Sequence, residues 1–323
     1  MIEFSNILAN HSKLSTRSEA STGRLAQIRA KALDPSYTAL ASKSVSVFAA
    51  GSLGRLEAGE KSDLDVFVIS NERDSIQKLD EYQIFAALID LNRQLNFEQF
   101  SRDGKFLKVH VVSDLTSETG KPQDDSENRF TTRMLLLLES HAITNDAVYS
   151  QAIETIASHY FRDSVGKKDF RPLFLLNDVL RFWRTLCLNY EEIRNDPERH
   201  WIKKNLNLKF SRKLTVFSTA LSIVTGRVSG VSSLVKLSQE TPLERLASTL
   251  DHLSDPELLS AFPSALDDYE LFLSAKEEGV MDDSSSDRSS RKLEHAATRF
   301  GEFLLSALES GRIDRKMRSY MLI

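Results

Sequence analysis

The sequence predicts an α+β protein in which a mixed sheet with flanking helices precedes an all-helical lobe. Short apolar, β-branched segments, typical of buried strands, occur at Val45–Ala50, Leu64–Ile69 and Phe106–Val112. From Ala147 onward no segment has this character, and apolar residues recur at helical spacing instead. We therefore predict a first domain over residues 1–145 and a helical domain over residues 146–323.

Along the chain, helices are expected before, between and after the predicted strands. A helix over Thr16–Ala41 precedes the first strand and is expected to be split at Pro35, because proline interrupts helical hydrogen bonding. Further helices are expected over Ser75–Leu95 and Phe130–Ser140, where apolar residues are frequent. The polar residues Thr116–Asn128 are expected to form a loop.

The second domain is expected to contain helices and one polar, serine-rich loop at Met281–Ser290. The expected helical segments are Val148–Tyr160, Asp169–Arg194, His200–Thr225, Ser232–Leu237, Pro242–Leu253, Leu266–Glu277 and Lys292–Ser310. No internal repeat accompanies this series of helices.

The composition is typical of a cytoplasmic protein. The chain has 323 residues, of which 41% are hydrophobic, so it can form two domains or one large one. The single cysteine, Cys187, excludes an intramolecular disulfide and a cysteine-based zinc site. We recognise no signal peptide, and no segment approaches the roughly 20 apolar residues of a membrane helix. The net charge of −4 gives no reason to expect DNA binding.

The segment between the first two strands is the strongest candidate for a functional site. A glycine-containing turn, Gly51–Arg55, follows the first strand, and Asp63 and Asp65 stand where the second strand begins. Because strand side chains alternate, the two aspartates point the same way, with Cα atoms roughly 6–7 Å apart. Paired carboxylates on one face call for a neutralising cation, and their oxygens suit Mg²⁺. The glycines let backbone N–H groups approach a phosphate.

These residues resemble the motif of the polymerase-β-like nucleotidyltransferases. Gly-Ser-Leu-Gly-Arg-x-Glu followed by Ser-Asp-Leu-Asp is most similar to the PII-uridylyltransferase-related bacterial branch. The segment Thr131–His141 resembles the region that follows the catalytic sheet in that branch, so the resemblance extends to about residue 145. The resemblance implies a reaction in which a hydroxyl attacks the α-phosphorus of an NTP and pyrophosphate leaves.

The resemblance implies a catalytic and metal-binding role for Asp63 and Asp65. Two Mg²⁺ ions about 3.5–4 Å apart are typical of such transfers. The residues expected to contact the triphosphate, most simply of ATP or UTP, are Gly51, Ser52 and Gly54. Arg55 is expected either to bind a phosphate or to form a salt bridge with Glu57 or Glu60.

The family normally supplies a third carboxylate from a neighbouring strand, and this chain departs from that pattern. The third predicted strand carries His110 near its centre and no acid. His110 is expected either to act as a ligand or base, or to be a hydrogen-bonded, partly buried residue. The other candidates are Glu98, Asp103, Asp114 and the pair Asp124–Asp125, for which a solvated loop is the alternative.

The helical domain offers two groups of cations. Asn177, Arg181 and Arg184 recur at helical spacing on one face, where they are expected either to bind phosphate or an acidic partner, or to form salt bridges. The segment Arg199–Lys213 contains six Lys or Arg residues and no acid. Within it, Lys209 and Arg212 are expected to meet the nucleotide or an acidic acceptor. The alternatives are a contact with nucleic acid or an acidic protein, and a solvated basic face.

The sequence therefore predicts an Mg²⁺-dependent nucleotidyltransferase whose helical domain closes over the nucleotide. The acceptor is expected to be a protein, a small molecule, an RNA end or a second nucleotide. The alternative is a catalytically inactive nucleotide-binding protein with a regulatory or interaction role, which the missing third carboxylate allows.

Overall fold

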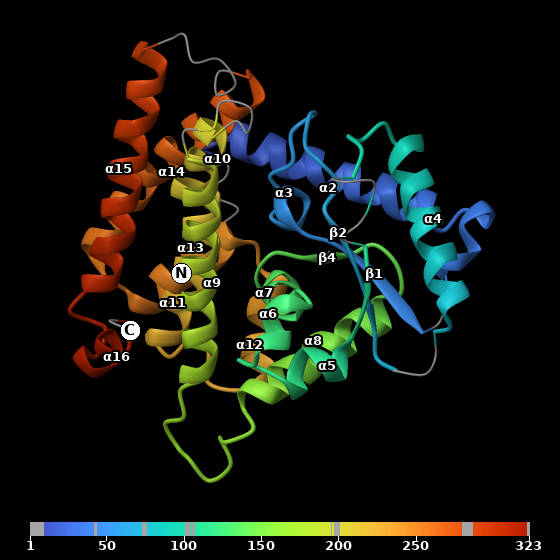
Figure 1. Ribbon diagram of the computed structural model, residues 1–323. Coiled ribbons are helices and arrows are strands. Elements are labelled where there is room, and N and C mark those ends of the chain that lie inside the picture. The colour runs from blue at the N-terminus through green and yellow to red at the C-terminus, as the bar shows by residue number, and fades with distance from the viewer. Residues whose placement is uncertain are drawn as a thin grey trace. The chain divides into compact units, whose positions relative to one another are not determined.

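The protein divides into two compact units, which we describe separately (Figure 1). The computed structural model describes residues 10–41, 44–72, 76–100, 104, 107–194, 196, 201–279 and 287–321. The sheet unit comprises Arg17–Val165 and Gly230–Thr241, and the helical unit comprises Met1–Thr16, Gly166–Ser229 and Pro242–Ile323. Within the described ranges, no helix has both the length and the apolar character that a bilayer crossing requires.

A small mixed sheet forms the centre of the sheet unit, which confirms the α+β class. Its strands, in the spatial order β3-β2-β1-β4, are β3 (Val109–Val111), β2 (Val66–Ser70), β1 (Val45–Ala49) and β4 (His141–Ala142). β1 is antiparallel to β2 and β4, whereas β2 and β3 are parallel. A parallel pair needs a crossover, and helix α4 (Lys78–Gln94) lies in that connection.

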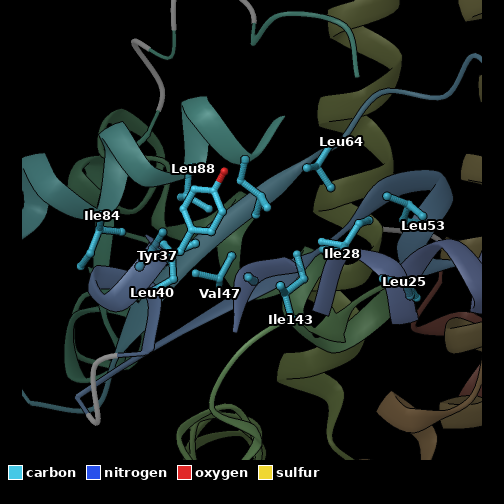
Figure 2. Close-up of a cluster of buried hydrophobic side chains, with 14 of the residues drawn as sticks. Leu25, Ile28, Tyr37, Leu40, Val47, Leu53, Leu64, Ile84, Leu88 and Ile143 are labelled. Carbon is cyan, nitrogen blue, oxygen red and sulfur yellow. The ribbon is translucent and has the colours of Figure 1, made fainter. Parts of the chain in front are cut away.

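The two faces of the sheet carry different side chains. Val47 pairs with Val68, and both are buried in a core that also contains residues of helices α2 (Ser12–Ala32) and α4 (Figure 2). Phe48 and Phe67 pair on the opposite face, where their rings stack with centroids 5.4 Å apart. The ring of Tyr149 in helix α8 (Asp146–Tyr160) lies against Phe48. This alternation is the period of two that the sequence predicts for strands.

The helices of the sheet unit agree with the sequence in part. They are α2 (Ser12–Ala32), most of which belongs here, the 3₁₀-helix η1 (Pro35–Ala41), α3 (Gly51–Gly54), α4, α5 (Val112–Ser117), α6 (Pro122–Ser126), α7 (Arg129–Leu138), α8 (Asp146–Tyr160) and α12 (Val231–Gln239). The predicted break at Pro35 is confirmed, because α2 ends before it. The predicted loop over residues 116–128 is wrong, since α6 forms there with Pro122 at its first turn.

The helical unit contains longer helices than the sheet unit. They are α9 (Leu173–Ile193), α10 (Trp201–Asn207), the π-helix η4 (Leu208–Arg212), α11 (Lys213–Val224), α13 (Pro242–Leu253), α14 (Pro256–Glu277), α15 (Asp287–Glu309) and α16 (Arg315–Ser319). Aromatic rings fill its core, where Phe210 stacks on Phe272 with centroids 4.6 Å apart. As predicted, the described residues beyond Ala147 form no strand.

Several predicted helices of the helical unit differ from those observed. Helix α14 begins at Pro256 rather than Leu266, because the side chain of Asp255 caps it and Pro263 is tolerated inside it. The single helix predicted up to Thr225 is interrupted by the π-turn of η4. Helix α15 already begins at Asp287, inside the predicted serine-rich loop, whose residues 281–286 lie outside the described residues.

Candidate functional site

The glycine turn joins the end of β1 to the segment that carries the two aspartates. Gly51 has a left-handed backbone with φ of +65° and is the first residue of the short helix α3. The backbone N–H of Ala50 donates to the carbonyl oxygen of Asp65 at 2.9 Å, which continues the β1–β2 pairing by one residue. The turn and Asp65 are therefore neighbours in the folded chain, although 13 residues separate Gly51 from Asp65 along the sequence.

Gly51 is also the point of closest approach between the turn and the aspartates. A Cβ atom placed on Gly51 would stand less than 3.0 Å from the carboxylate oxygen Oδ2 of Asp65. Only a residue without a side chain leaves room for that carboxylate, and only glycine adopts the left-handed backbone here without strain. The first N–H groups of a helical turn have no acceptor within the turn, so the start of α3 offers donors beside the carboxylate.

Asp63 and Asp65 are both exposed, and the side chain of Leu64 between them is buried. The two aspartates precede β2, which begins at Val66 rather than at Leu64 as predicted. The alternation of exposure across the three residues agrees with the prediction that both carboxylates share one side of the chain. Mg²⁺ is commonly held by one or two carboxylates together with water and substrate phosphates, so this pair fits a Mg²⁺ site.

Gly54 has a different role from Gly51. A Cβ atom on Gly54 would stand less than 3.0 Å from the backbone carbonyl of Glu139, which immediately precedes Ser140 and β4. This glycine therefore allows the turn to pack directly on the backbone at the start of β4. The sequence assigned Gly54 to phosphate contact, and its packing against Glu139 is an additional reason for a glycine at this position.

Arg55 lies in a buried ionic cluster beneath the turn. Its Nε donates to Glu57 Oε2 at 2.9 Å, and its Nη1 donates to Glu139 Oε2 at 2.7 Å. All three side chains are at most 5% exposed. Of the two roles expected for Arg55, the salt bridge to Glu57 is the one that this geometry supports. Glu139 was not identified from the sequence, because it lies 84 residues from Arg55 and no local pattern connects them.

The side chain of Ser52 is half-buried, and its backbone oxygen accepts a hydrogen bond from the N–H of Glu57 at 2.8 Å. Among the residues that the structure describes, the hydroxyl of Ser52 makes no hydrogen bond. A half-exposed hydroxyl at the start of the turn remains a suitable donor to a phosphate oxygen.

His110 does not join the two aspartates. It pairs with Ile69 in the parallel β2–β3 ladder, four residues beyond Asp65, which corresponds to about 13 Å along the strand. Its imidazole is buried, and its Nε2 lies 3.2 Å from the hydroxyl of Thr132. Burial, followed by the charges of Lys108 and Arg129, lowers the pKa of His110 to about 4. The expectation of a hydrogen-bonded core histidine is therefore the one that the structure supports.

The other candidates for a third carboxylate are occupied or lie elsewhere. Asp124 is buried and paired with Arg133, so the solvated loop expected around it is wrong. Asp114 lies 3.8 Å from Arg129, Glu98 is exposed, and Asp103 lies outside the described residues. Over the described ranges, no group of three or more His, Cys, Asp or Glu side chains is arranged to hold a metal. The carboxylate pair is therefore the candidate metal site.

The predicted cations of the helical domain belong to the helical unit, whereas Asp63 and Asp65 belong to the sheet unit. Arg181 lies 3.9 Å from the buried carboxylate of Asp178, which supports the salt bridge expected on α9. Lys209 and Arg212 are half-exposed and lie in the π-helix, whose wider turn alters the angle between residues three apart.

Lys213 is a further cation that the sequence did not single out. It is half-exposed at the start of α11, and its Nζ would stand 3.1 Å from a Cβ atom on Gly301 of α15. Burial, followed by the nearby charge of Lys209, lowers the pKa of Lys213. The local sequence gave no signal for this residue, because the partner glycine is 88 residues away.

Comparison of the chain with protein-family models and with curated proteins finds no match.

The two glycines of the turn provide a matched test of the site. We expect Gly51→Ala to displace the Asp65 carboxylate and to weaken Mn²⁺ binding about tenfold. The strain of a left-handed backbone at alanine should lower the free energy of unfolding by about 1–2 kcal/mol. Gly54→Ala should instead destabilise the fold by about 3 kcal/mol, because the added Cβ atom would clash with backbone atoms of Glu139. Urea unfolding and Mn²⁺ titration separate the two effects. Equal losses of stability in both variants would contradict this assignment.

The lowered pKa of His110 predicts a dependence of stability on pH. The unfolded chain, with an ordinary histidine pKa near 6.5, binds this proton more readily than the folded protein, whose His110 pKa is about 4. The stabilisation is therefore complete above pH 6.5 and is lost as the pH falls towards 4.

Between pH 7.5 and pH 5, we expect the free energy of unfolding of the parent protein to fall by about 2 kcal/mol more than that of His110→Gln. Urea unfolding at the two pH values measures both. His252→Gln, at an exposed histidine of the helical unit, is the control substitution. The interpretation fails if His110→Gln is as acid-sensitive as the parent.

Proposed function

We propose that the protein is an Mg²⁺-dependent nucleotidyltransferase of the polymerase-β-like kind. The observation that carries the proposal is the contact between the Gly51 turn and the carboxylate of Asp65, with Asp63 exposed on the same side of the chain. A phosphate-binding turn beside a pair of carboxylates is what metal-assisted phosphoryl chemistry requires. The mixed sheet and the helical unit are compatible with the fold that the resemblance implies.

In this proposal, Asp63 and Asp65 would hold Mg²⁺, which would supply positive charge for the α-phosphate of the NTP. Bound Mg²⁺, two ions by resemblance to the family, would neutralise charge on the phosphates and orient the reacting oxygens. The N–H groups at the start of α3 and the hydroxyl of Ser52 bind the remaining phosphates. A hydroxyl of the acceptor attacks the α-phosphorus, the bond to the bridging oxygen breaks, and pyrophosphate leaves.

Arg55 contributes to the proposed site by holding the turn rather than by binding a phosphate. Its guanidinium bridges Glu57, which follows the turn, and Glu139, which precedes β4. Because the ion pairs are buried, removal of either partner leaves an uncompensated charge. The buried cluster therefore fixes the turn to the segment before β4. The position of the turn in its contact with Asp65 depends on this cluster.

The proposed nucleotide and acceptor are the classes that the sequence predicts. ATP or UTP is the expected NTP, and the acceptor is a protein, a small molecule, an RNA end or a nucleotide. The binding of a triphosphate or an acidic acceptor by Lys209 and Arg212 stays a prediction, which rests on two half-exposed cations in a segment without acids.

The direct test is transfer of label from each α-³²P-labelled NTP in the presence and absence of Mg²⁺. Pyrophosphate release should depend on Mg²⁺ and should disappear in the double variant Asp63→Asn with Asp65→Asn. A protein that bound an NTP without turnover under every acceptor tested would support the second candidate, an inactive nucleotide-binding protein. That candidate is favoured by one observation, the absence of a third carboxylate near the pair within the described residues.

A further inference from the structure

Helix α2 carries two polar residues on the side that faces the core. Leu25 and Ile28 of this side are buried in the core beside β1 and β2 (Figure 2). Ser21 and Arg17 continue the same side one and two turns earlier, and they are only 1% and 8% exposed. Buried polar groups are costly unless they are hydrogen-bonded, so their partners explain why they are there.

Their partners are consecutive carbonyl groups of the loop that leads to the aspartates. Nη1 of Arg17 donates to the carbonyl of residue 57 at 3.4 Å, and Oγ of Ser21 donates to the carbonyl of residue 58 at 3.2 Å. Nη1 of Arg24 donates to the carbonyls of residues 59 and 60, at 2.8 and 3.2 Å. Three side chains at positions i, i+4 and i+7 of one helix therefore hold four successive carbonyls.

This loop is irregular, so its carbonyls have no strand partner of the kind that β1 and β2 provide for each other. Within the loop, residues 59–62 form a hydrogen-bonded turn. The N–H of Gly59 donates to the hydroxyl of Ser62 at 2.9 Å, and the N–H of Ser62 donates to the carbonyl of Gly59 at 3.2 Å. Helix α2 supplies donors to these carbonyls, of which those of residues 57 and 58 are buried and therefore need a protein donor. Asp63 follows this turn directly, and the buried side chain of Leu64 fixes the chain again.

Arg24 is held by an aromatic ring as well as by its hydrogen bonds. Its guanidinium lies over the ring of Phe97, 4.0 Å from the ring centre, which fixes the plane of the donor group. It contacts the two carbonyls closest to Asp63. A planar guanidinium can serve two acceptors at once, whereas a lysine ammonium would lack that geometry.

We propose that Arg24, supported by Arg17 and Ser21, is a positioning residue that sets the conformation of the segment carrying Asp63 and Asp65. The proposal rests on the proposed function for its meaning, because the two carboxylates are the metal ligands in that function. It adds residues of α2 that neither the glycine motif nor the family resemblance indicates. Loss of the donors would release the loop from residue 57 to residue 62 and widen the range of positions available to Asp63.

The test compares Arg24→Met with a matched variant on the same helix, Arg29→Met. Arg29 also donates from its guanidinium to a backbone carbonyl, that of Ala142 in β4, at 2.7 Å. Both changes remove one arginine and its hydrogen bonding to backbone carbonyls from α2, but only the first concerns the loop. Arg24→Lys is the rescue variant, since an ammonium can restore one of the two hydrogen bonds.

Two measurements are made on each full-length variant. Hydrogen exchange of the amides between residues 58 and 65 reports on the loop, and titration with Mn²⁺ alone reports on the carboxylates. In Arg24→Met we expect loop exchange to accelerate about tenfold and Mn²⁺ affinity to fall about tenfold. Arg24→Lys should recover part of both losses, and Arg29→Met should change neither.

The outcomes separate this inference from the proposed function. If Arg24→Met accelerates loop exchange no more than Arg29→Met does, the inference is wrong. Faster loop exchange with unchanged Mn²⁺ affinity would also overturn it, because the loop would then not position the carboxylates. If the parent protein itself binds no Mn²⁺ and transfers no nucleotide, the proposed function fails, and the exchange data alone show whether α2 sets the conformation of this segment.

Discussion

Asp65→Asn is expected to lower Mg²⁺-dependent nucleotidyl transfer by about a hundredfold to a thousandfold, the range typical of losing one preorganised electrostatic group. The carboxylate lies against the Gly51 turn, where a Cβ atom on residue 51 would displace it. Because Asp65 is exposed, the free energy of unfolding should change by only about 0.5 kcal/mol. A purely structural aspartate would show the opposite pattern.

Steady-state transfer and urea unfolding should be measured on Asp65→Asn, Asp63→Asn and the control Glu60→Gln. Glu60 is an exposed acid three residues before Asp63, so its replacement removes the same charge from the same loop. We expect the two aspartate variants to lose activity and Mn²⁺ binding together, and the control to keep both. Wild-type transfer by Asp65→Asn would remove this residue from the catalytic site.

Asp124→Ala is expected to destabilise the sheet unit by about 3–5 kcal/mol, because it leaves the buried guanidinium of Arg133 without its carboxylate. The two groups form a paired contact, with Nη1 to Oδ1 at 2.8 Å and Nη2 to Oδ2 at 3.0 Å. Arg133 also donates to the carbonyl of Leu115 and to the hydroxyl of Tyr160. One guanidinium therefore joins α5, α6, α7 and α8, and Arg133 is fully buried.

Urea unfolding of Asp124→Ala and of its exposed neighbour variant Asp125→Ala provides the comparison. The neighbour should lose about 1 kcal/mol at most, as surface charges do. Replacing both members of the buried pair, with Asp124→Leu and Arg133→Met, should recover much of the loss, since an apolar pair needs no compensation. Equal stability of the two single variants would show that the buried pair contributes nothing.

Local pattern was sufficient for strands β1 and β2 and for the glycine turn and the two aspartates between them. The β-branched segments around Val47 and Val68 form strands because they are buried on one face, and burial follows directly from their apolar side chains. The alternation at Asp63, Leu64 and Asp65 was visible in the sequence for the same reason. These features depend on residues close together in the chain.

Features that depend on distant partners were not predicted. Strand β4 has only two residues, and its pairing with Phe48 and Ala49 defines it. The polar segment around Asp124 was taken for a solvated loop, because its partner Arg133 is itself a charged residue inside an apolar segment. A charged residue is ordinarily expected at the surface, and only the pairing makes its burial favourable.

The sequence by itself determined the α+β class, the glycine turn after the first strand and the pair of aspartates before the second. Periodicity and glycine placement encode these features over a few residues. Only the tertiary structure decided the interaction partners of the charged and titratable side chains. It engaged Arg55 with Glu57 and Glu139, buried His110 away from the aspartates, and placed Arg24 on the loop that leads to them. Charged groups have no periodic signature, because their positions depend on the desolvation and pairing that the folded chain provides.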